Sequence, residues 1–133
     1  MAEQQQPTTS APTTSRRMRI LIAEDHAPTR MAIAKLMRHA GAEVVSARDG
    51  EEALGYVLTQ RFDVLLTDLQ MPVMDGIELL AQCAKLPEHR RPKRMIAISG
   101  EYDAGVLEGQ AVQFVSKPFD VNSLLDMLGG KPN

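Results

Sequence analysis

The sequence predicts an α/β fold in which five parallel strands form one sheet with helices on both faces. From Met18 onward, short aliphatic or β-branched runs alternate with segments of helical periodicity, which is typical of strands joined by crossover helices. The run from Phe62 to Asp68 is almost continuously apolar, as expected for a central strand covered on both faces. At 133 residues, the chain has the length of one domain.

The strands follow from the positions of the apolar runs, and the helices from apolar residues repeated at spacings of three and four. Pro28 suits the first turn of the first helix, because its missing N–H costs nothing there. Asp49 and Asp120 are the expected N-caps of the second and the last helix. The predicted strands are residues 19–23, 43–47, 62–68, 95–99 and 113–117, and the predicted helices are about 28–39, 50–58, 77–86 and 121–128.

Apolar residues at helical spacing predict which faces of two helices meet the core. The expected stripes are Ile33, Leu36, Met37 and Ala40 in the first helix and Ile77, Leu80, Ala81 and Ala84 in the third. Between the fourth and fifth strands, residues 100–110 contain three glycines, so we expect only a short, frayed helix there.

Composition divides the chain into a flexible arm and one folded domain. Residues 1–17 are rich in Gln, Thr, Ser and Pro and have almost nothing apolar to bury, so we expect a disordered N-terminal arm. The folded domain is expected at residues 18–128 and a short tail at 129–133. The chain has neither a secretory signal nor an apolar stretch of the roughly 20 residues that span a membrane. We therefore expect a cytoplasmic protein with no membrane partner.

Cysteine content, net charge and aromatic content exclude further classes of site. Cys83 is the only cysteine, which excludes an internal disulfide and a thiolate zinc site. The net charge of −2 and the aromatic content of 4% argue against a nucleic-acid partner. The basic cluster at residues 89–94 is interpreted as a solvated loop that enters a strand, in preference to a docking patch for an acidic partner.

Four of the predicted strands end on reactive polar groups. Glu24 and Asp25 follow the first strand, Asp68 ends the third, Ser99 ends the fourth and Lys117 ends the fifth. Ligands of an open parallel sheet bind outside the carboxyl ends of its strands, so these five side chains are expected to converge. Such a site suits a hard divalent cation and a phosphoryl group.

Three carboxylates in one small site raise one another's pKa unless a cation is present. Mg²⁺ prefers oxygen ligands and keeps several waters, so we expect it as the cofactor. Asp25 and Asp68 would bind it directly, and the backbone carbonyl of Gln70 would complete the protein ligands. Glu24 would act directly or through a water molecule.

Asp68 is the expected phosphoacceptor, because its carboxylate can attack a phosphoryl donor in line and form an acyl phosphate. Lys117 would pair with one phosphoryl oxygen, and Ser99 would donate a hydrogen bond to another. The same geometry admits water, so the acyl phosphate should hydrolyse spontaneously and act as a timed state.

These motifs, taken in order, resemble the receiver domain of two-component response regulators, the CheY-like family. They are the acidic pair after the first strand, the sequence DLQMPVMDG that begins at Asp68, the residue Ser99, and the tripeptide Lys117-Pro118-Phe119. The resemblance covers residues 18 to about 128. It implies a receiver domain, as a single-domain protein or as an excised domain, with a doubly wound sheet of strand order 2-1-3-4-5.

The resemblance also implies how such a domain works in signal transduction. A histidine kinase or a histidine phosphotransfer protein would phosphorylate Asp68 with Mg²⁺ as cofactor. The peptide bond between Lys117 and Pro118 would be cis, and Ser99 would move toward the phosphoryl group while Phe114 changes rotamer. The domain would catalyse only its own phosphorylation and dephosphorylation, so it is not expected to be an enzyme. It would signal to another protein, as a monomer or a phosphorylation-dependent dimer.

The chain departs from the family pattern at three points. The stretch between Ser99 and Lys117 is about four residues shorter than usual, roughly one helical turn, which puts a fourth helix in doubt. Glu24 stands where Asp is commoner, which lengthens the reach to the metal. Phe114 lacks the hydroxyl of the Tyr that is found there in relatives.

Two other functions on this topology are excluded by chemistry. An FMN-binding flavodoxin needs a first loop that cradles phosphate, and Glu24 and Asp25 would repel it. A phosphatase of the haloacid dehalogenase group needs a second Asp where this chain has Gln70. A phosphorelay intermediate, a phosphate sink and a degenerate receiver that acts only as an interaction module stay open. Gln70 and Glu101 flank the site and are expected to tune the phosphoryl lifetime.

Overall fold

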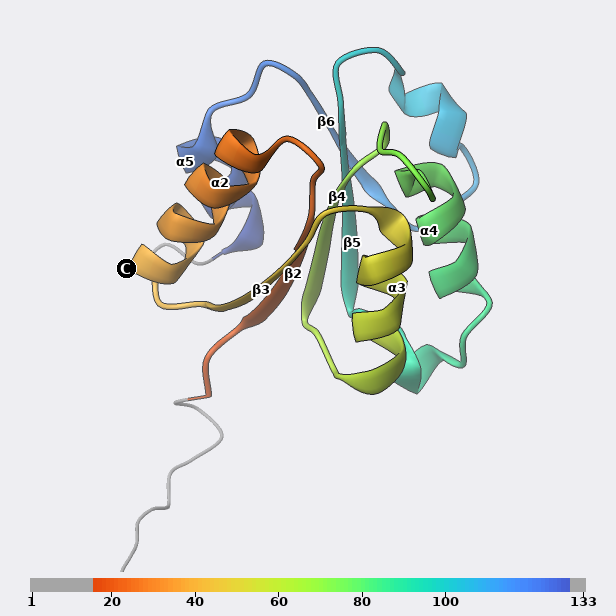
Figure 1. Ribbon diagram of the computed structural model, residues 1–133, viewed down its shortest axis with the longest axis horizontal. Helices are drawn as coiled ribbons and strands as arrows, with labels where there is room; N and C mark the ends of the chain where they lie inside the picture. Colours follow the sequence, from red (N-terminus) through yellow and green to blue (C-terminus); the bar gives the residue numbers. More distant parts are fainter. Residues whose placement is uncertain (1–15, 130–133) are drawn as a thin grey trace, which may run out of the picture.

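The computed structural model describes residues 16–129 as a parallel sheet between two helical layers (Figure 1). The expected arm up to residue 15 and the expected tail from residue 130 lie outside the described residues. The sheet has the order β3-β2-β4-β5-β6, which confirms the predicted order 2-1-3-4-5. Its strands are β2 (Arg19–Ala23), β3 (Glu43–Ala47), β4 (Val64–Asp68), β5 (Arg94–Ser99) and β6 (Gln113–Ser116).

The register aligns the carboxyl ends of the strands at one edge of the sheet. Ala23, the last residue of β2, pairs with Ala47 of β3 and with Thr67 of β4. Asp68, the last residue of β4, pairs with Ile98 of β5. Residues that follow these strands therefore emerge next to one another, as the prediction of a common site requires.

The helices cover both faces of the sheet (Figure 1). Helices α2 (Ala27–His39) and α5 (Val121–Leu128) cover one face, and α3 (Gly50–Thr59) and α4 (Gly76–Ala84) cover the other. Alternate strand residues divide between two cores: Ile20 and Ile22 pack with the α2 and α5 residues, whereas Leu21 packs with those of α3 and α4. Burial on both faces explains why the strands are nearly continuously apolar.

The helix starts follow the predicted capping chemistry. The Asp49 carboxylate accepts a hydrogen bond from the Glu52 N–H at 2.8 Å, and the Asp120 carboxylate accepts one from the Asn122 N–H at 3.0 Å. Asp75 caps α4 in the same way. Each carboxylate satisfies a backbone donor that the first helical turn leaves unpaired.

Both predicted core stripes need correction. In α2, Leu36 is 38% exposed, and Ala34 is buried beside Ile33 and Met37. In α4 the buried side chains are Leu79, Leu80 and Cys83, while Ile77 and Ala81 are half-buried and Ala84 is exposed. Apolar residues occupy most positions of α4, so spacing alone does not select its buried face, and packing on α3 and the sheet decides it.

The connection between β5 and β6 contains one 3₁₀ turn, η3 (Ala104–Leu107), in place of a full helix. Its start is capped by the Asp103 carboxylate, which accepts a hydrogen bond from the Gly105 N–H at 2.9 Å. Leu107 is 4% exposed and anchors the turn to the core shared with α3 and α4. The segment is therefore as short as expected, and its single turn has 3₁₀ geometry. No helix within residues 16–129 is long and apolar enough to cross a membrane.

Candidate functional site

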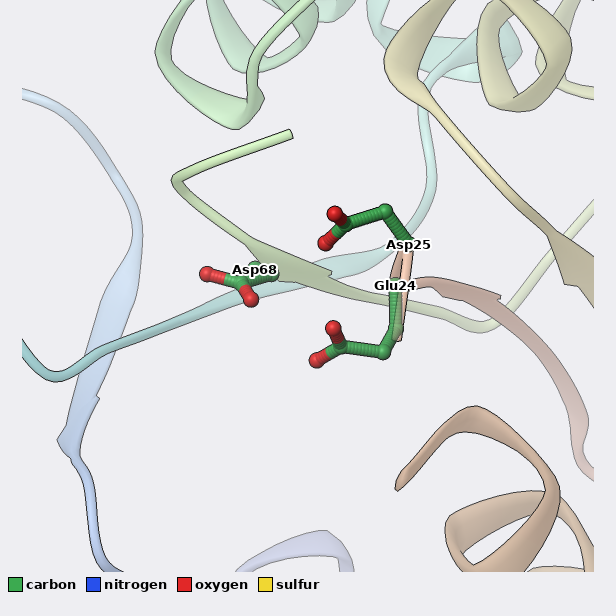
Figure 2. Close-up of side chains that lie close together, drawn as sticks. All are labelled: Glu24, Asp25 and Asp68. Carbon is green, nitrogen blue, oxygen red and sulfur yellow. The ribbon is translucent and has the colours of Figure 1, made fainter. Parts of the chain in front are cut away.

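Three carboxylates meet at the carboxyl edge of the sheet and form the acidic cluster, which consists of Glu24, Asp25 and Asp68. One carboxylate oxygen of each lies within 4.8 Å of the others. Figure 2 shows the three side chains directed toward a common space, two from the loop after β2 and one from the end of β4. Glu24 is 3% exposed and Asp68 is 6% exposed, whereas Asp25 is exposed to solvent.

The ammonium of Lys117 faces this cluster. The Nζ of Lys117, just after β6, lies 2.9 Å from Oδ2 of Asp68 and 3.6 Å from Oε1 of Glu24. The Gln70 N–H donates to Oδ1 of Asp68 at 3.1 Å, so both carboxylate oxygens of Asp68 are held in place. With all three acids ionised, the cluster and Lys117 together carry a net charge of about −2.

The excess of negative charge changes the ionisation of the buried acid. Burial, together with the charge of Asp68, raises the pKa of Glu24 from 4.5 to about 7. A hydrogen bond from the His26 N–H and the charge of Lys117 oppose this rise. Burial also acts to lower the pKa of Lys117, but the hydrogen bond and charge of Asp68 and the charge of Glu24 outweigh it and raise that pKa.

The donor chemistry of the cluster fits a hard divalent cation. Its side chains offer only carboxylate oxygens, which Mg²⁺ and Ca²⁺ prefer. His26 does not point to a softer metal, because its Nδ1 lies 2.6 Å from the Thr29 hydroxyl and caps α2. A cation would also offset the repulsion that raises the pKa of Glu24.

Ser99 and Phe114 lie on neighbouring strands beside the cluster. Ser99 is fully buried, and its hydroxyl oxygen accepts hydrogen bonds from the Glu101 N–H at 3.1 Å and the Tyr102 N–H at 2.9 Å. In this arrangement Ser99 caps the loop that follows β5. Phe114 on β6 is half-buried against the core shared with α3 and α4, and the Glu101 side chain is exposed.

The backbone around the site includes features that the sequence analysis named only in part. The peptide bond between Lys117 and Pro118 is cis, as the resemblance implies. Val73 has a φ of +69°, and the N–H of Met74 donates to the carbonyl of Pro72 at 2.7 Å across it. A β-branched residue is strained at positive φ, so the loop after β4 stores backbone strain beside Asp68.

Two residues that the sequence analysis missed hold the acidic loops in position. A side chain at position 76 would collide with the backbone carbonyl of Asp68, so only glycine lets α4 begin this close to β4. The Arg30 guanidinium donates to the carbonyl of Glu24 at 2.9 Å and thereby ties α2 to the acidic pair. The DG step at 75–76 is a sequence signal for the first contact, and nothing local in the sequence indicates the second.

A groove lies beside Lys117, between α2 and the loop that leads to α5. It has a volume of about 600 Å³. Its lining is mainly apolar and, apart from the buried Ile33, exposed or half-buried. The lining residues are Pro28, Thr29, Ala32, Ile33, Lys117, Pro118 and Phe119. Lys117 lines this groove and also contacts Asp68, so a molecule bound in the groove would lie next to the acidic cluster.

The sequence matches known proteins over nearly all of the described residues. It matches the response regulator receiver domain over residues 20–129. It is 36% identical over 108 residues to a protein-glutamate methylesterase/protein-glutamine glutaminase from Archaeoglobus fulgidus. That match covers 76% of this chain but only 30% of the relative, so the chain spans less than a third of the relative's length.

Solved structures resemble the fold closely. The chemotaxis response regulator CheY4 of Vibrio cholerae superimposes with a TM-score of 0.76 at 27% identity, covering 86% of this chain and 98% of that one. The receiver domain of the sensor histidine kinase PA1611 from Pseudomonas aeruginosa has a TM-score of 0.74 at 26% identity. That match covers 85% of this chain and 95% of the other, and that structure holds a magnesium ion in its active-site cleft.

Proposed function

Because the chain belongs to the response regulator receiver family, we propose that it is a phosphorylation-dependent switch of two-component signalling. In this proposal Asp68 accepts a phosphoryl group from a histidine kinase or a histidine phosphotransfer protein. The changed state is then read by a partner protein that prefers one of the two conformations. The family and the acidic cluster support the general assignment, and the individual roles below are our inferences.

The observation that carries the proposal is the environment of Asp68. Asp68 is 6% exposed, and its carboxylate lies 2.9 Å from the Lys117 Nζ and belongs to the same cluster as the exposed Asp25. One carboxylate oxygen would form a P–O bond while the bond from phosphorus to the donor nitrogen breaks, and the electron pair stays on that nitrogen. The Lys117 ammonium, already 2.9 Å from Asp68, would then pair with a phosphoryl oxygen.

Glu24, Asp25, Asp68 and the backbone carbonyl of Gln70 are the groups that we expect to hold Mg²⁺. The cation would supply positive charge that neutralises the carboxylates and the incoming phosphoryl oxygens. The magnesium ion in the similar Pseudomonas aeruginosa receiver supports this choice of cofactor. Asp25 is the one exposed carboxylate of the three, so it would meet an entering ion before Glu24 and Asp68 do.

Ser99, Phe114 and the loop after β5 form the proposed conformational switch. The Ser99 hydroxyl accepts two backbone hydrogen bonds in the present state, so its own proton remains available to donate to a phosphoryl oxygen. Turning toward that oxygen would weaken the bonds to Glu101 and Tyr102 and release the loop. Phe114 would change rotamer as the loop moves. Gln70 and Glu101 flank the site in this proposal and would tune the phosphoryl lifetime.

The groove beside Lys117 is the proposed docking site for the phosphodonor protein. Its apolar lining on α2 and at Phe119 suits a helix of the donor, and its position would bring a phosphohistidine to Asp68. A phosphorelay intermediate or a phosphate sink would use the same surface.

A degenerate receiver would not transfer a phosphoryl group. The presence of Asp68, Lys117 and Ser99 together disfavours that alternative. A cytoplasmic location stays a prediction.

The test uses the complete 133-residue chain with acetyl phosphate and Mg²⁺. We expect intact-protein mass spectrometry to detect one added phosphoryl group in the wild type and none in Asp68→Asn. Asp63→Asn, which removes a carboxylate at the other edge of the sheet, is the matched control and should be labelled normally. Undiminished labelling of Asp68→Asn would show another acceptor, and no labelling of the wild type would favour the degenerate receiver.

A further inference from the structure

The amino edge of the sheet, opposite the acidic cluster, gathers most of the positive charge of the chain. Eight of the 15 lysines and arginines lie at residues 16–19, 61 and 90–94, which precede or begin β2, β4 and β5. These segments are adjacent in space, because the Asp63 N–H donates to the Arg19 carbonyl and the Arg94 N–H donates to the Asp63 carbonyl. The sequence shows one basic cluster at 89–94, and the fold joins it to two further cationic segments.

A cavity of about 310 Å³ opens at this edge. Five basic side chains line it and are here called the amino-edge patch: Arg16, Arg61, His89, Arg91 and Lys93. Phe62, Asp63 and Glu88 complete the lining. The patch is therefore a concave surface with more positive than negative side chains.

Two arginines of this region, Arg90 and Arg91, are oriented without being neutralised. The Arg91 guanidinium donates to the backbone carbonyl of Leu86 at 2.8 Å, and the adjacent Arg90 donates to that of Leu58 at 2.9 Å. Carbonyl oxygens carry no net charge, so the positive charge stays available to a ligand. Within residues 16–129 the Arg61 guanidinium has no hydrogen-bond or ion-pair partner. The carboxylate of Asp63 is already shared between Arg16 at 3.2 Å and Lys93 at 3.9 Å.

We propose that the amino-edge patch binds an acidic segment of a partner protein. The held guanidinium of Arg91, the guanidinium of Arg61, unpaired within residues 16–129, and the Lys93 ammonium suit separate carboxylates, which they can bind one by one. A nucleic acid is disfavoured, because Asp63 and Glu88 interrupt the positive surface and would repel closely spaced phosphates. Phe62 is only 5% exposed, so it offers no face on which a base could stack.

The position of the patch makes this docking independent of the acidic cluster. The two edges are separated by strands such as the five-residue β2, a length of about 16 Å. This exceeds the screening length of about 8 Å at physiological salt, so a charge change at one edge has little effect at the other. A partner held at the amino edge would leave the acidic cluster and its neighbouring groove accessible.

The experiment measures binding of a fluorescein-labelled oligoglutamate peptide to the full chain by fluorescence anisotropy. We expect saturable binding that weakens with added salt. The double variant Arg61→Gln with Lys93→Gln should bind roughly fivefold more weakly. The control, Lys35→Gln with Lys85→Gln, removes the same charge from exposed positions on α2 and after α4, and should bind within about twofold of the wild type.

Chemical-shift mapping on the wild-type chain keeps the proposal testable even if the double variant is unstable. Oligoglutamate should shift the amide signals of residues 61–63 and 88–93 and leave those of α2 unchanged. An equal loss of affinity in both double variants, shifts spread evenly over the surface, or no binding at low salt would overturn the proposal. Tighter binding of an oligothymidylate of matched charge at the same amides would overturn it in favour of a nucleic-acid partner.

Discussion

The two edges of the sheet place carboxylates in opposite electrostatic surroundings. At the carboxyl edge, Glu24 shares a small space with two other acids and one lysine, and burial with the charge of Asp68 raises its pKa to about 7. At the amino edge, burial also acts to raise the pKa of Asp63. The hydrogen bond from the Arg19 N–H and the charges of Arg16 and Lys93 outweigh it, so that pKa is lowered.

The difference teaches what burial of an acid means in this molecule. Asp63 is ionised in a place that favours its charge, so it stabilises the fold and joins β2 to β4. Glu24 is held where its charge is disfavoured, so the folded protein is less stable for having it ionised. Before its cation enters, a cation-binding site holds carboxylates whose ionisation destabilises the fold, and Glu24 beside Asp68 and Lys117 fits that description.

The largest expected effect that separates the two edges is stabilisation by Mg²⁺. At roughly 100 times its dissociation constant, an ion that binds only the folded state raises the free energy of unfolding by about 2.7 kcal/mol. Urea denaturation with and without Mg²⁺ should show this gain in the wild type and in Asp63→Asn. Asp25→Asn should lose most of it, because that residue contributes an exposed ligand. An undiminished gain in Asp25→Asn would mean that the ion binds elsewhere.

The next largest effect is the pH dependence of the stability of the metal-free protein. The pKa of Glu24 is higher in the folded state than its ordinary value of 4.5, so stability falls as pH rises from about 4.5 to about 7. Glu24→Gln should remove this loss and raise the free energy of unfolding at pH 8 by about 2 kcal/mol. The measurement is urea denaturation in EDTA across this pH range. A variant less stable than the wild type at pH 8 would contradict the assigned sign.

At the amino edge we expect a smaller pH dependence of stability, with the opposite sign. The pKa of Asp63 is lower when folded than its ordinary value of 3.8. Its stabilising contribution is therefore full above that value and is lost as pH falls through the folded pKa. Asp63→Asn should lower the free energy of unfolding by about 1 kcal/mol at pH 7. The same denaturation series should show the two proteins converging in strong acid, and a constant difference at all pH values would exclude the charge as its cause.

The smallest expected effect belongs to Lys93. Its Nζ lies 3.9 Å from the Asp63 carboxylate and its side chain is 74% exposed, so solvent screens the pair. Lys93→Gln should change the free energy of unfolding by less than about 0.5 kcal/mol in urea denaturation at neutral pH. A loss above 1 kcal/mol would assign this lysine a structural role that the geometry does not indicate.

Local patterns in the sequence determined much of this fold. The bounds of β2 and β3 agree with the predicted ranges, and Asp49 and Asp120 cap the helices that they were expected to cap. Alternation, helical spacing and capping are properties of neighbouring residues, so they can be recognised without the fold. The meeting of Glu24, Asp25, Asp68 and Lys117 was predictable for a related reason, because parallel strands bring their carboxyl ends together. Their functional roles stay predictions.

Only the tertiary structure decided the features that depend on residues far apart in the chain. It selected Leu79, Leu80 and Cys83 as the buried face of α4, where apolar residues at most positions leave the buried face undecided. It joined the cations at 16–19, 61 and 90–94 into one surface. It also made one buried acid harder to ionise and another easier. The energy of a charge depends on burial and on the charges around it, which separate segments supply only after the chain has folded.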